Sequence, residues 1–247
     1  MLQIDVLTLF PEAFSGYLQH SIIGRAIERH FVDVRLHDIR SYTHDKHNTA
    51  DDYPYGGGAG MVMKPEPVFE AVESVISGDE NTEYQVILLT PQGRMFTQEI
   101  AGELAARKNI IFICGHYEGV DERVAEHLVT DEISIGDYLL SGGESAAMVV
   151  MDSLVRLLPG AIGSGTSLDE ESHVGNLLEY PQYTRPPEFR GWQVPDVLLS
   201  GNHKEIALWR RQQSIMRTAR RRPDLLRKAS LTEAEYRMLK SSGLQNN

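Results

Sequence analysis

Three glycine-containing segments of the sequence each follow a short apolar run. They read LTPQG at residues 89–93, CGHYEG at 114–119 and IGDYLLSGG at 135–143. In a parallel sheet, ligands bind beyond the carboxyl ends of the strands, and glycines there let a ligand approach backbone N–H and C=O groups. Glycine is also common in ordinary strand-to-helix turns, which accounts for one such loop more easily than for three in series. The spacing therefore predicts a single crevice built from three loops.

The composition of these loops narrows the kind of ligand that they would bind. No G-x-x-x-x-G-K phosphate-binding loop occurs, and each G-x-G in the chain lacks the third glycine of the dinucleotide fingerprint. The loops contain the carboxylates of Glu118 and Asp137 and a single arginine, Arg94. That balance favours a neutral or cationic ligand over a triphosphate.

Other polar side chains are weaker candidates. Arg156 follows a helical run, where it either acts on a ligand or complements the helix dipole. The acidic segment at residues 169–171 supplies either a general base or a solubilising linker. The histidines His37, His44 and His47 lie near aspartates without a metal-binding motif, so a solvated polar loop is the favoured interpretation.

A fourth glycine cluster and the lone cysteine have simple structural explanations. Residues 53–61 (YPYGGGAGM) are typical of a flexible connection, although Tyr53 and Tyr55 are also suited to stacking on bases. Cys114 ends an apolar run and is expected to be a small buried residue rather than a nucleophile.

The elements that must position these residues follow from hydrophobic periodicity. A helix is expected to start at Pro11 and to carry Phe14, Leu18 and Ile22. Further helices are expected at residues 97–108, 121–129 and 148–158, between apolar strands near residues 4–9, 32–36, 86–89, 110–114 and 132–135. Strands separated by helices predict parallel pairing, so the expected fold class is α/β with a parallel sheet.

The chain is expected to divide into two domains. Residues 1–160 form the α/β domain, residues 161–175 a flexible acidic linker rich in Gly and Ser, and residues 176–247 a basic, mainly helical domain. Asn202 with Glu205, and Thr232 with Glu235, have the spacing of helix N-caps.

The net charge of −11 argues at first against a nucleic-acid partner, but the charge is unevenly distributed. Residues 201–247 hold 11 basic and 4 acidic side chains, for a balance of +7, whereas residues 1–200 hold 13 and 31, for −18. Arg210, Arg217 and Arg221 recur on one helical face next to Trp209, which indicates a surface for phosphate groups. One cysteine excludes a disulfide framework, and no signal peptide or apolar span is visible, so a cytoplasmic protein is expected.

Several blocks of the sequence resemble the bacterial tRNA (guanine-N1)-methyltransferase family. They are LTPQG at 89–93, ICGHYEGVDERV at 113–124, SIGDYLLSGGE at 134–144, PQYTRP at 181–186 and VPDVLLSGNHKEIALWR at 194–210. The match runs nearly end to end and in the family's order. The resemblance implies a SPOUT-class fold with a trefoil knot, a homodimer with shared active sites, S-adenosylmethionine as methyl donor, and methylation of the guanosine 3′ of the anticodon at tRNA position 37.

The same resemblance assigns the site residues. The basic C-terminal domain would hold the anticodon arm of the tRNA. The cofactor contacts would fall on Pro91, Gly93, Gly115, Tyr117, Gly119, Ile135, Gly136, Asp137, Tyr138, Leu139, Leu140, Gly142 and Gly143.

Arg156 would stabilise the charge that develops on guanine O6, and a carboxylate in the acidic linker would remove the N1 proton. Here the sequence departs from the family, which usually has Asp-Ser where this chain has Glu171-Ser172. Glu171 is the expected base and Asp169 its competitor, while Glu179 would help to place the base or a Mg²⁺ ion. Two alternatives stay open: another SPOUT RNA methyltransferase, acting on a ribose 2′-hydroxyl or another base, and a non-catalytic anticodon-binding module.

Overall fold

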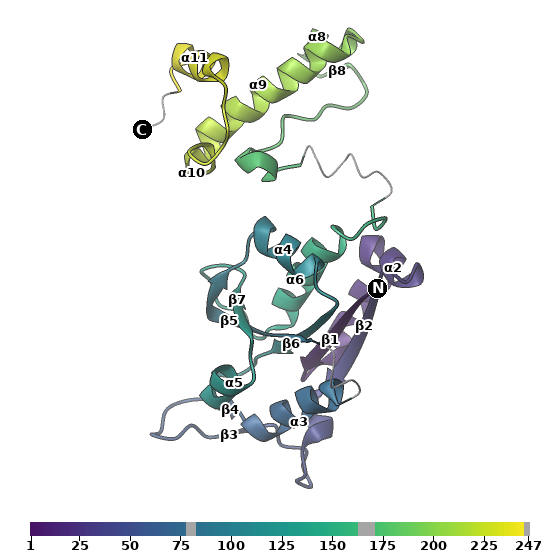
Figure 1. Ribbon diagram of the computed structural model, residues 1–247, viewed down its shortest axis with the longest axis vertical. Helices are drawn as coiled ribbons and strands as arrows, with labels where there is room; N and C mark the ends of the chain where they lie inside the picture. The colour runs from purple at the N-terminus through teal and green to yellow at the C-terminus, as the bar shows by residue number, and fades with distance from the viewer. Residues whose placement is uncertain (78–82, 163–170, 245–247) are drawn as a thin grey trace. The chain divides into compact units, whose positions relative to one another are not determined.

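A computed structural model describes residues 1–77, 83–162 and 171–244 of the chain (Figure 1). The chain divides into two compact units, Met1–Gly163 and Ser164–Asn247.

The first unit is built on a parallel five-stranded sheet in the order β2-β1-β6-β5-β7. The strands are β1 (Leu2–Thr8), β2 (Val32–Asp38), β5 (Gln85–Met95), β6 (Asn109–Cys114) and β7 (Asp131–Ser134). The register pairs Ile4 with Ile110, Leu88 with Ile113 and Leu89 with Ile133. Because all five strands are parallel, their carboxyl ends share one edge of the sheet, as the sequence predicted.

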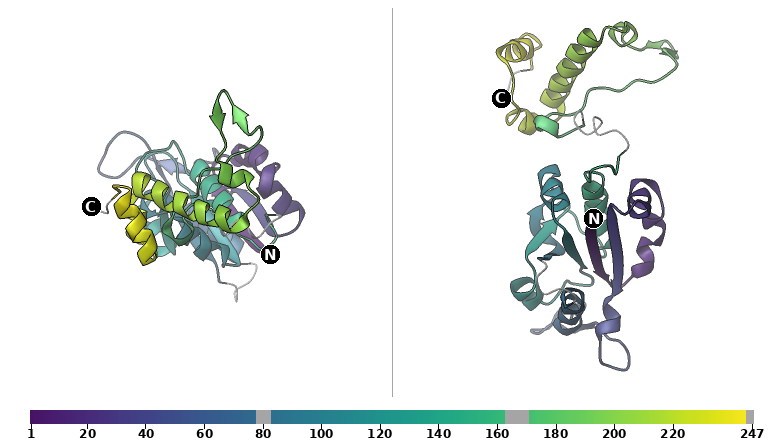
Figure 2. Two further views of the ribbon diagram at one scale, coloured as in Figure 1. Left: turned by 90° about the horizontal axis from the view of Figure 1, so that it is seen from above. Right: turned by 45° about the vertical axis from the view of Figure 1, so that its right-hand side comes forward.

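Helices cover both faces of this sheet (Figure 2). One face packs against α2 (Ser21–Glu28), α4 (Gln98–Ala105) and α6 (Glu144–Val155). The other packs against α3 (Pro65–Ile76), α5 (Glu122–His127) and the short 3₁₀ helix η2 (Ile39–Tyr42). Neighbouring strand residues alternate between the two layers: Ile110 and Phe112 belong to the first core, and Ile111 and Ile113 to the second. The central strands are therefore apolar on both faces, as in other buried parallel sheets.

The prediction of a single helix starting at Pro11 was wrong. The chain forms a 3₁₀ turn η1 (Pro11–Phe14), one turn of helix α1 (Ser15–Leu18) and then α2. The break falls where His20 is extended (φ −125°, ψ 165°) and Ser21 has a φ of 61°. A positive φ ends helical geometry, so the pattern of apolar residues continues through a chain that changes direction.

The second unit is mainly helical. It contains η3 (Val174–Asn176), a hairpin of β8 (Glu188–Phe189) and β9 (Trp192–Gln193), and helices α8 (Asp196–Leu199), α9 (His203–Arg221), α10 (Pro223–Leu226) and α11 (Glu233–Ser241). Both expected N-caps are confirmed: Asn202 Oδ1 accepts from the Glu205 amide, and Thr232 and Glu235 form a reciprocal capping box. A small apolar core joins Leu177 to Ile215, Leu226, Ala229 and Leu239. No helix in the described residues is long and apolar enough to cross a bilayer.

Candidate cofactor site

The three predicted cofactor loops lie on neighbouring strands. They follow the ends of β6 and β7 and occupy the outer part of β5, and β5 lies between the other two in the sheet. Because the strands are parallel, the structure brings together at one edge all the residues predicted to contact the cofactor: Pro91, Gly93, Gly115, Tyr117, Gly119, the run from Ile135 to Leu140, Gly142 and Gly143.

The third loop crosses the sheet edge and returns to the second loop, at residues 114–119. It leaves β7, whose only neighbour in the described sheet is β5, and reaches the end of β6 on the far side of β5. There Gly142 forms an antiparallel bridge with His116, and the Gly143 amide donates to the Gly115 carbonyl at 2.9 Å. A β-carbon at Gly143 would lie 2.7 Å from the Cα of Cys114, so only glycine fits this crossing.

Gly93 marks a second close approach, between β5 and β7. The register of this strand pair shifts between Leu89 and Arg94, so residues 90–93 bulge out of the ladder. Beyond the bulge, Arg94 bonds the Asp131 carboxylate at 2.8 Å and that of Glu103 at 2.9 Å, and these hydrogen bonds raise its pKa. The arginine that directly follows the first loop in the sequence is therefore engaged in ion pairs with Asp131 and Glu103.

Exposed apolar and aromatic side chains border these loops. Leu139 is 83% exposed, and Tyr117, Tyr138 and Leu140 are each about half exposed. Tyr138 folds back over Gly136, and its hydroxyl donates to the Ile135 carbonyl at 3.2 Å. Burial raises the pKa of the Tyr117 phenol, with the charge of Asp51 adding to the effect. Such a surface suits an apolar or stacking ligand, or a partner chain.

The glycine cluster at residues 56–60 is anchored to the second cofactor loop, a link that the sequence patterns did not predict. Short strands β3 (Asp51–Asp52) and β4 (Val62–Met63) flank it. The Glu118 amide donates to the Met61 carbonyl, and the Met63 amide to the Gly119 carbonyl, both at 3.0 Å. Tyr53 and Tyr55 remain exposed. These backbone hydrogen bonds join residues far apart in the sequence, so no sequence motif predicts them.

The predicted catalytic residues lie elsewhere in the chain. Arg156 caps the carboxyl end of α6, whereas Gly143 caps its amino end. With a rise of 1.5 Å per residue, the two ends of this 12-residue helix are roughly 18 Å apart. Glu171 belongs to the second unit, and Asp169 lies outside the described residues. The described part of one chain therefore does not bring Arg156 to the loops.

The described residues contain no group of three or more His, Cys, Asp or Glu side chains that could hold a metal ion. His37 pairs with Asp5 and His44 with Glu70, both at 2.8 Å, and Glu179 Oε1 accepts from Gln182. Cys114 is buried, as expected, and burial raises the pKa of its thiol, with Glu144 adding to the shift.

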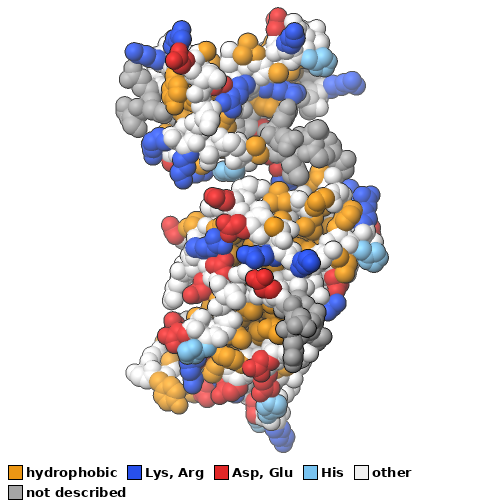
Figure 3. All heavy atoms as spheres, viewed as in Figure 1, with side chains coloured by type: hydrophobic (Ala, Val, Ile, Leu, Met, Phe, Trp, Pro, Cys, Tyr) orange, Lys and Arg blue, Asp and Glu red, His pale blue; other side chains and the backbone are white. Residues whose placement is uncertain are grey.

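Two of the three predicted phosphate-contacting arginines also make contacts within the second unit. The Arg210 guanidinium lies 4.7 Å from the centre of the Tyr180 ring, and Arg217 donates to the Glu179 carbonyl at 3.3 Å. Arg221 is exposed. Lysine and arginine side chains are visible at several places on this unit in Figure 3. The first two arginines thus help to hold residues 179–180 against α9.

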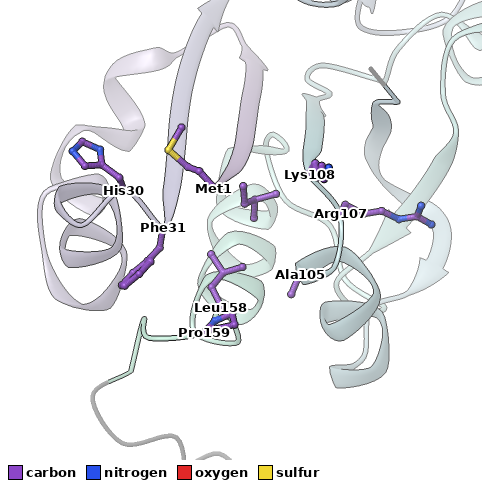
Figure 4. Close-up of a pocket in the computed structure, with 9 residues that line it drawn as sticks. Met1, His30, Phe31, Ala105, Arg107, Lys108, Leu158 and Pro159 are labelled. Carbon is purple, nitrogen blue, oxygen red and sulfur yellow. The ribbon is translucent and has the colours of Figure 1, made fainter. Parts of the chain in front are cut away.

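A cavity of about 300 Å³ lies at the opposite edge of the sheet (Figure 4). It is bordered by the starts of β1 and β6 and by the segment after α6, through Leu2, Phe31, Lys108, Leu158 and Pro159. Because ligands of parallel sheets bind at the carboxyl ends of the strands, the candidate site is the three-loop edge rather than this cavity.

The parallel sheet with its returning third loop defines a SPOUT-class α/β fold, which confirms the predicted fold class. The family described as tRNA (Guanine-1)-methyltransferase TrmD matches residues 2–228. Proteins named tRNA (guanine-N(1)-)-methyltransferase are similar throughout: one from Dehalococcoides mccartyi is 58% identical over 96% of both chains, and one from Geobacillus kaustophilus is 56% identical over 97% of both. The chain therefore belongs to the tRNA (guanine-N1)-methyltransferase family, as its motifs predicted.

Proposed function

We propose that this protein transfers a methyl group from S-adenosylmethionine to N1 of guanosine 37 in tRNA, next to the anticodon. The observation that carries the proposal is the convergence of three glycine-containing loops at one sheet edge, in a chain 56 to 58% identical to enzymes named for guanine-N1 methylation of tRNA.

The loops fit a cofactor with a cationic centre and a flat base. Gly119 has a φ of 131° and open space where a side chain would be, so a ligand could approach its Cα, while its amide and carbonyl are bonded to His116 and Met63. The residues that would hold the cofactor are Pro91, Gly93, Gly115, Tyr117, Gly119, the run from Ile135 to Leu140, Gly142 and Gly143. S-adenosylmethionine would supply an electrophilic methyl group on a sulfonium. The carboxylates of Glu118 and Asp137 suit a positive charge, and Arg94 is neutralised by its ion pairs.

Two side chains of this protein would act on the guanine, a carboxylate and an arginine. Glu171 would take the proton from N1, with Asp169 as the competing base. The guanidinium of Arg156 would lie beside O6 and stabilise the negative charge that develops there as N1 loses its proton. The longer side chain of glutamate reaches further than the aspartate usual in the family, so the base would approach from a backbone set slightly further away.

The position of Arg156 supports the proposal of a homodimer with shared active sites. Its separation of roughly 20 Å from Gly143 along α6 exceeds the reach of an arginine side chain. A second copy of the chain would therefore complete the site, with the loops of one subunit facing Arg156 of the other. The exposed apolar residues bordering the loops are suited to such an interface.

The second unit would hold the anticodon arm, and the protein would act in the cytoplasm, where tRNA is modified. Its basic side chains would contact phosphates and position the RNA without reading its sequence.

A Mg²⁺ ion near Glu179 would help to neutralise charge in the assembled site. A comparison of turnover with and without a chelator tests that role.

Methyl transfer to synthetic tRNA tests the function directly. Labelled methyl from S-adenosylmethionine is expected in a transcript with G at position 37 and absent when that base is A. Digestion to nucleosides should yield 1-methylguanosine. A 2′-O-methylated nucleoside would instead support another SPOUT methyltransferase, and tRNA binding without transfer would support the non-catalytic module.

A further inference from the structure

A buried hydroxyl–carboxyl pair joins two distant parts of the first unit. Thr8, at the end of β1, is fully buried, and Glu144, the first residue of α6, is 8% exposed. The Thr8 hydroxyl donates to Glu144 Oε1 at 2.7 Å and accepts from the Phe10 amide at 2.9 Å. A carboxyl group buried among apolar residues is costly unless it is hydrogen-bonded, so this contact needs a reason. Thr8 lies outside all three glycine-containing loops, so the sequence motifs do not account for this contact.

The second oxygen of the same carboxyl group lies against Gly142. A β-carbon at Gly142 would lie 2.4 Å from Glu144 Oε2 and 2.6 Å from Cδ2 of the His116 ring. Gly142 is therefore enclosed between a buried carboxyl group and an imidazole. The His116 ring in turn packs against the Phe10 ring, with the ring centres 5.1 Å apart.

This arrangement connects two of the three cofactor loops to β1. Gly142 and Gly143 end the third loop, and His116 belongs to the second. Phe10 touches His116 and donates its amide to Thr8, which bonds Glu144. The contacts thus form a closed set in which the end of β1 supports the place where the two loops meet.

We propose that Glu144 is a positioning residue for the cofactor: held by Thr8, its carboxyl group fixes Gly142 and Gly143 against residues 115–116. The inference rests on the proposed function, since it assigns a role to a residue behind the proposed cofactor site. Glu144 touches neither the methyl group nor the guanine. It acts through the backbone of the third loop, whose geometry decides whether its N–H and C=O groups meet the ligand.

Substitutions at Thr8 separate the hydroxyl from the shape of the side chain. Thr8→Val keeps the volume and removes the hydrogen bond, whereas Thr8→Ser keeps the hydrogen bond. Calorimetry of S-adenosylmethionine binding is expected to show a Kd raised about tenfold for Thr8→Val, the effect of losing one buried hydrogen bond to a carboxyl group, and near wild-type for Thr8→Ser. Glu144→Gln should weaken binding less than Glu144→Ala, because the amide oxygen still accepts from Thr8.

Steady-state kinetics should show the same selectivity. The KM for S-adenosylmethionine is expected to rise in Thr8→Val and Glu144→Ala, while the KM for tRNA stays unchanged. In both variants, hydrogen exchange should be faster at the Gly143 amide, which donates to the Gly115 carbonyl.

The matched control is Asp5→Asn, which alters another buried carboxylate on β1. This carboxylate bonds Gln3 and His37 and does not contact the loops. It should lower thermal stability and leave the Kd unchanged.

The outcomes separate this inference from the proposed function. Wild-type protein that fails to bind S-adenosylmethionine overturns both. Wild-type protein that binds it, with Thr8→Val and Glu144→Ala binding equally well, overturns the positioning role alone. An equal rise in Kd for Asp5→Asn would also overturn that role, because the effect would then reflect general destabilisation of the sheet.

Discussion

The backbone of Gly93 lies against that of Ile133, so closely that a β-carbon on Gly93 would be 2.4 Å from the Ile133 nitrogen. The contact fixes the bulge of β5 on β7, and the loop that contains Pro91 and Gly93 depends on it. Backbone atoms of a paired strand cannot give way as a flexible side chain does, so the position has no tolerance for a methyl group.

Gly93→Ala is therefore expected to destabilise the first unit by about 2 kcal/mol and to weaken S-adenosylmethionine binding. Denaturant unfolding and calorimetry measure the two effects. Gly102→Ala is the matched control, because Gly102 lies within α4 with open space at its Cα. It should stabilise the protein by up to about 1 kcal/mol through helix propensity. Equal stability of the two variants would contradict the predicted clash.

Exchange of the candidate bases tests the departure from the family pattern. Glu171→Gln is expected to lower kcat by roughly 10² to 10⁴-fold, the usual effect of removing a general base, with a small change in KM. Asp169→Asn should lower kcat far less. Single-turnover methyl transfer measures the chemical step directly, and the reverse ranking would assign the base to Asp169.

Mixed dimers test whether Arg156 and the loops come from different subunits. An Arg156→Ala chain and a Gly93→Ala chain are each expected to be nearly inactive. Refolding the two together should restore roughly a quarter of wild-type activity, because random pairing makes half of the dimers mixed and each mixed dimer has one intact site. No recovery, with mixed dimers isolated by two affinity tags, would place Arg156 and the loops of one chain in the same site.

The second unit should lose stability in mild acid through Glu235. Arg211 Nε lies 2.7 Å from Glu235 Oε1 and lowers the pKa of that carboxyl group. A pKa that is lower in the folded state stabilises the fold above the unfolded pKa, and this stabilisation disappears as the pH falls through the folded pKa. Glu235→Gln should therefore be less stable than wild type at pH 7 and should approach it near pH 3.

Tryptophan fluorescence during urea unfolding measures this effect, because both tryptophans, Trp192 and Trp209, belong to the second unit. Asp224→Asn is the control, since its pair with Arg222 is solvent-exposed and should contribute little. A pH profile for Glu235→Gln parallel to that of wild type would rule out the ion pair as the cause.

Local patterns in the sequence predicted much of this fold. The runs at 86–89 and 110–114 are apolar on both faces because their strands are central, and the caps at Asn202 and Thr232 are recognisable because their partners lie three residues away. The break at Ser21 was missed because a positive φ at a single residue leaves no trace in hydrophobic periodicity.

The candidate site could be predicted from the sequence only in part, because some of its contacts are long-range. The glycines of the three loops indicated where the site lies, since glycine is required where two backbones approach closely. The bond between Thr8 and Glu144 spans 136 residues, and the anchoring of residues 61–63 to residues 118–121 uses only backbone groups. Such contacts depend on the order of strands in the sheet, which a single sequence does not specify. The positive charge of residues 201–247 was evident from the sequence. The contacts of Arg210 with the Tyr180 ring and of Arg217 with the Glu179 carbonyl were not predicted.

The buried thiol of Cys114 can be used to measure local opening of the sheet near the cofactor loops. It is the only cysteine in the chain, it has no exposed surface, and its Cα lies beneath Gly143 at the crossing of the loops. A thiol reagent can modify it only when this part of the sheet opens, so the labelling rate measures the free energy of that opening in unmodified protein. Protection that increases on adding S-adenosylmethionine would report, from a single sulfur atom, how firmly the ligand closes the end of β6.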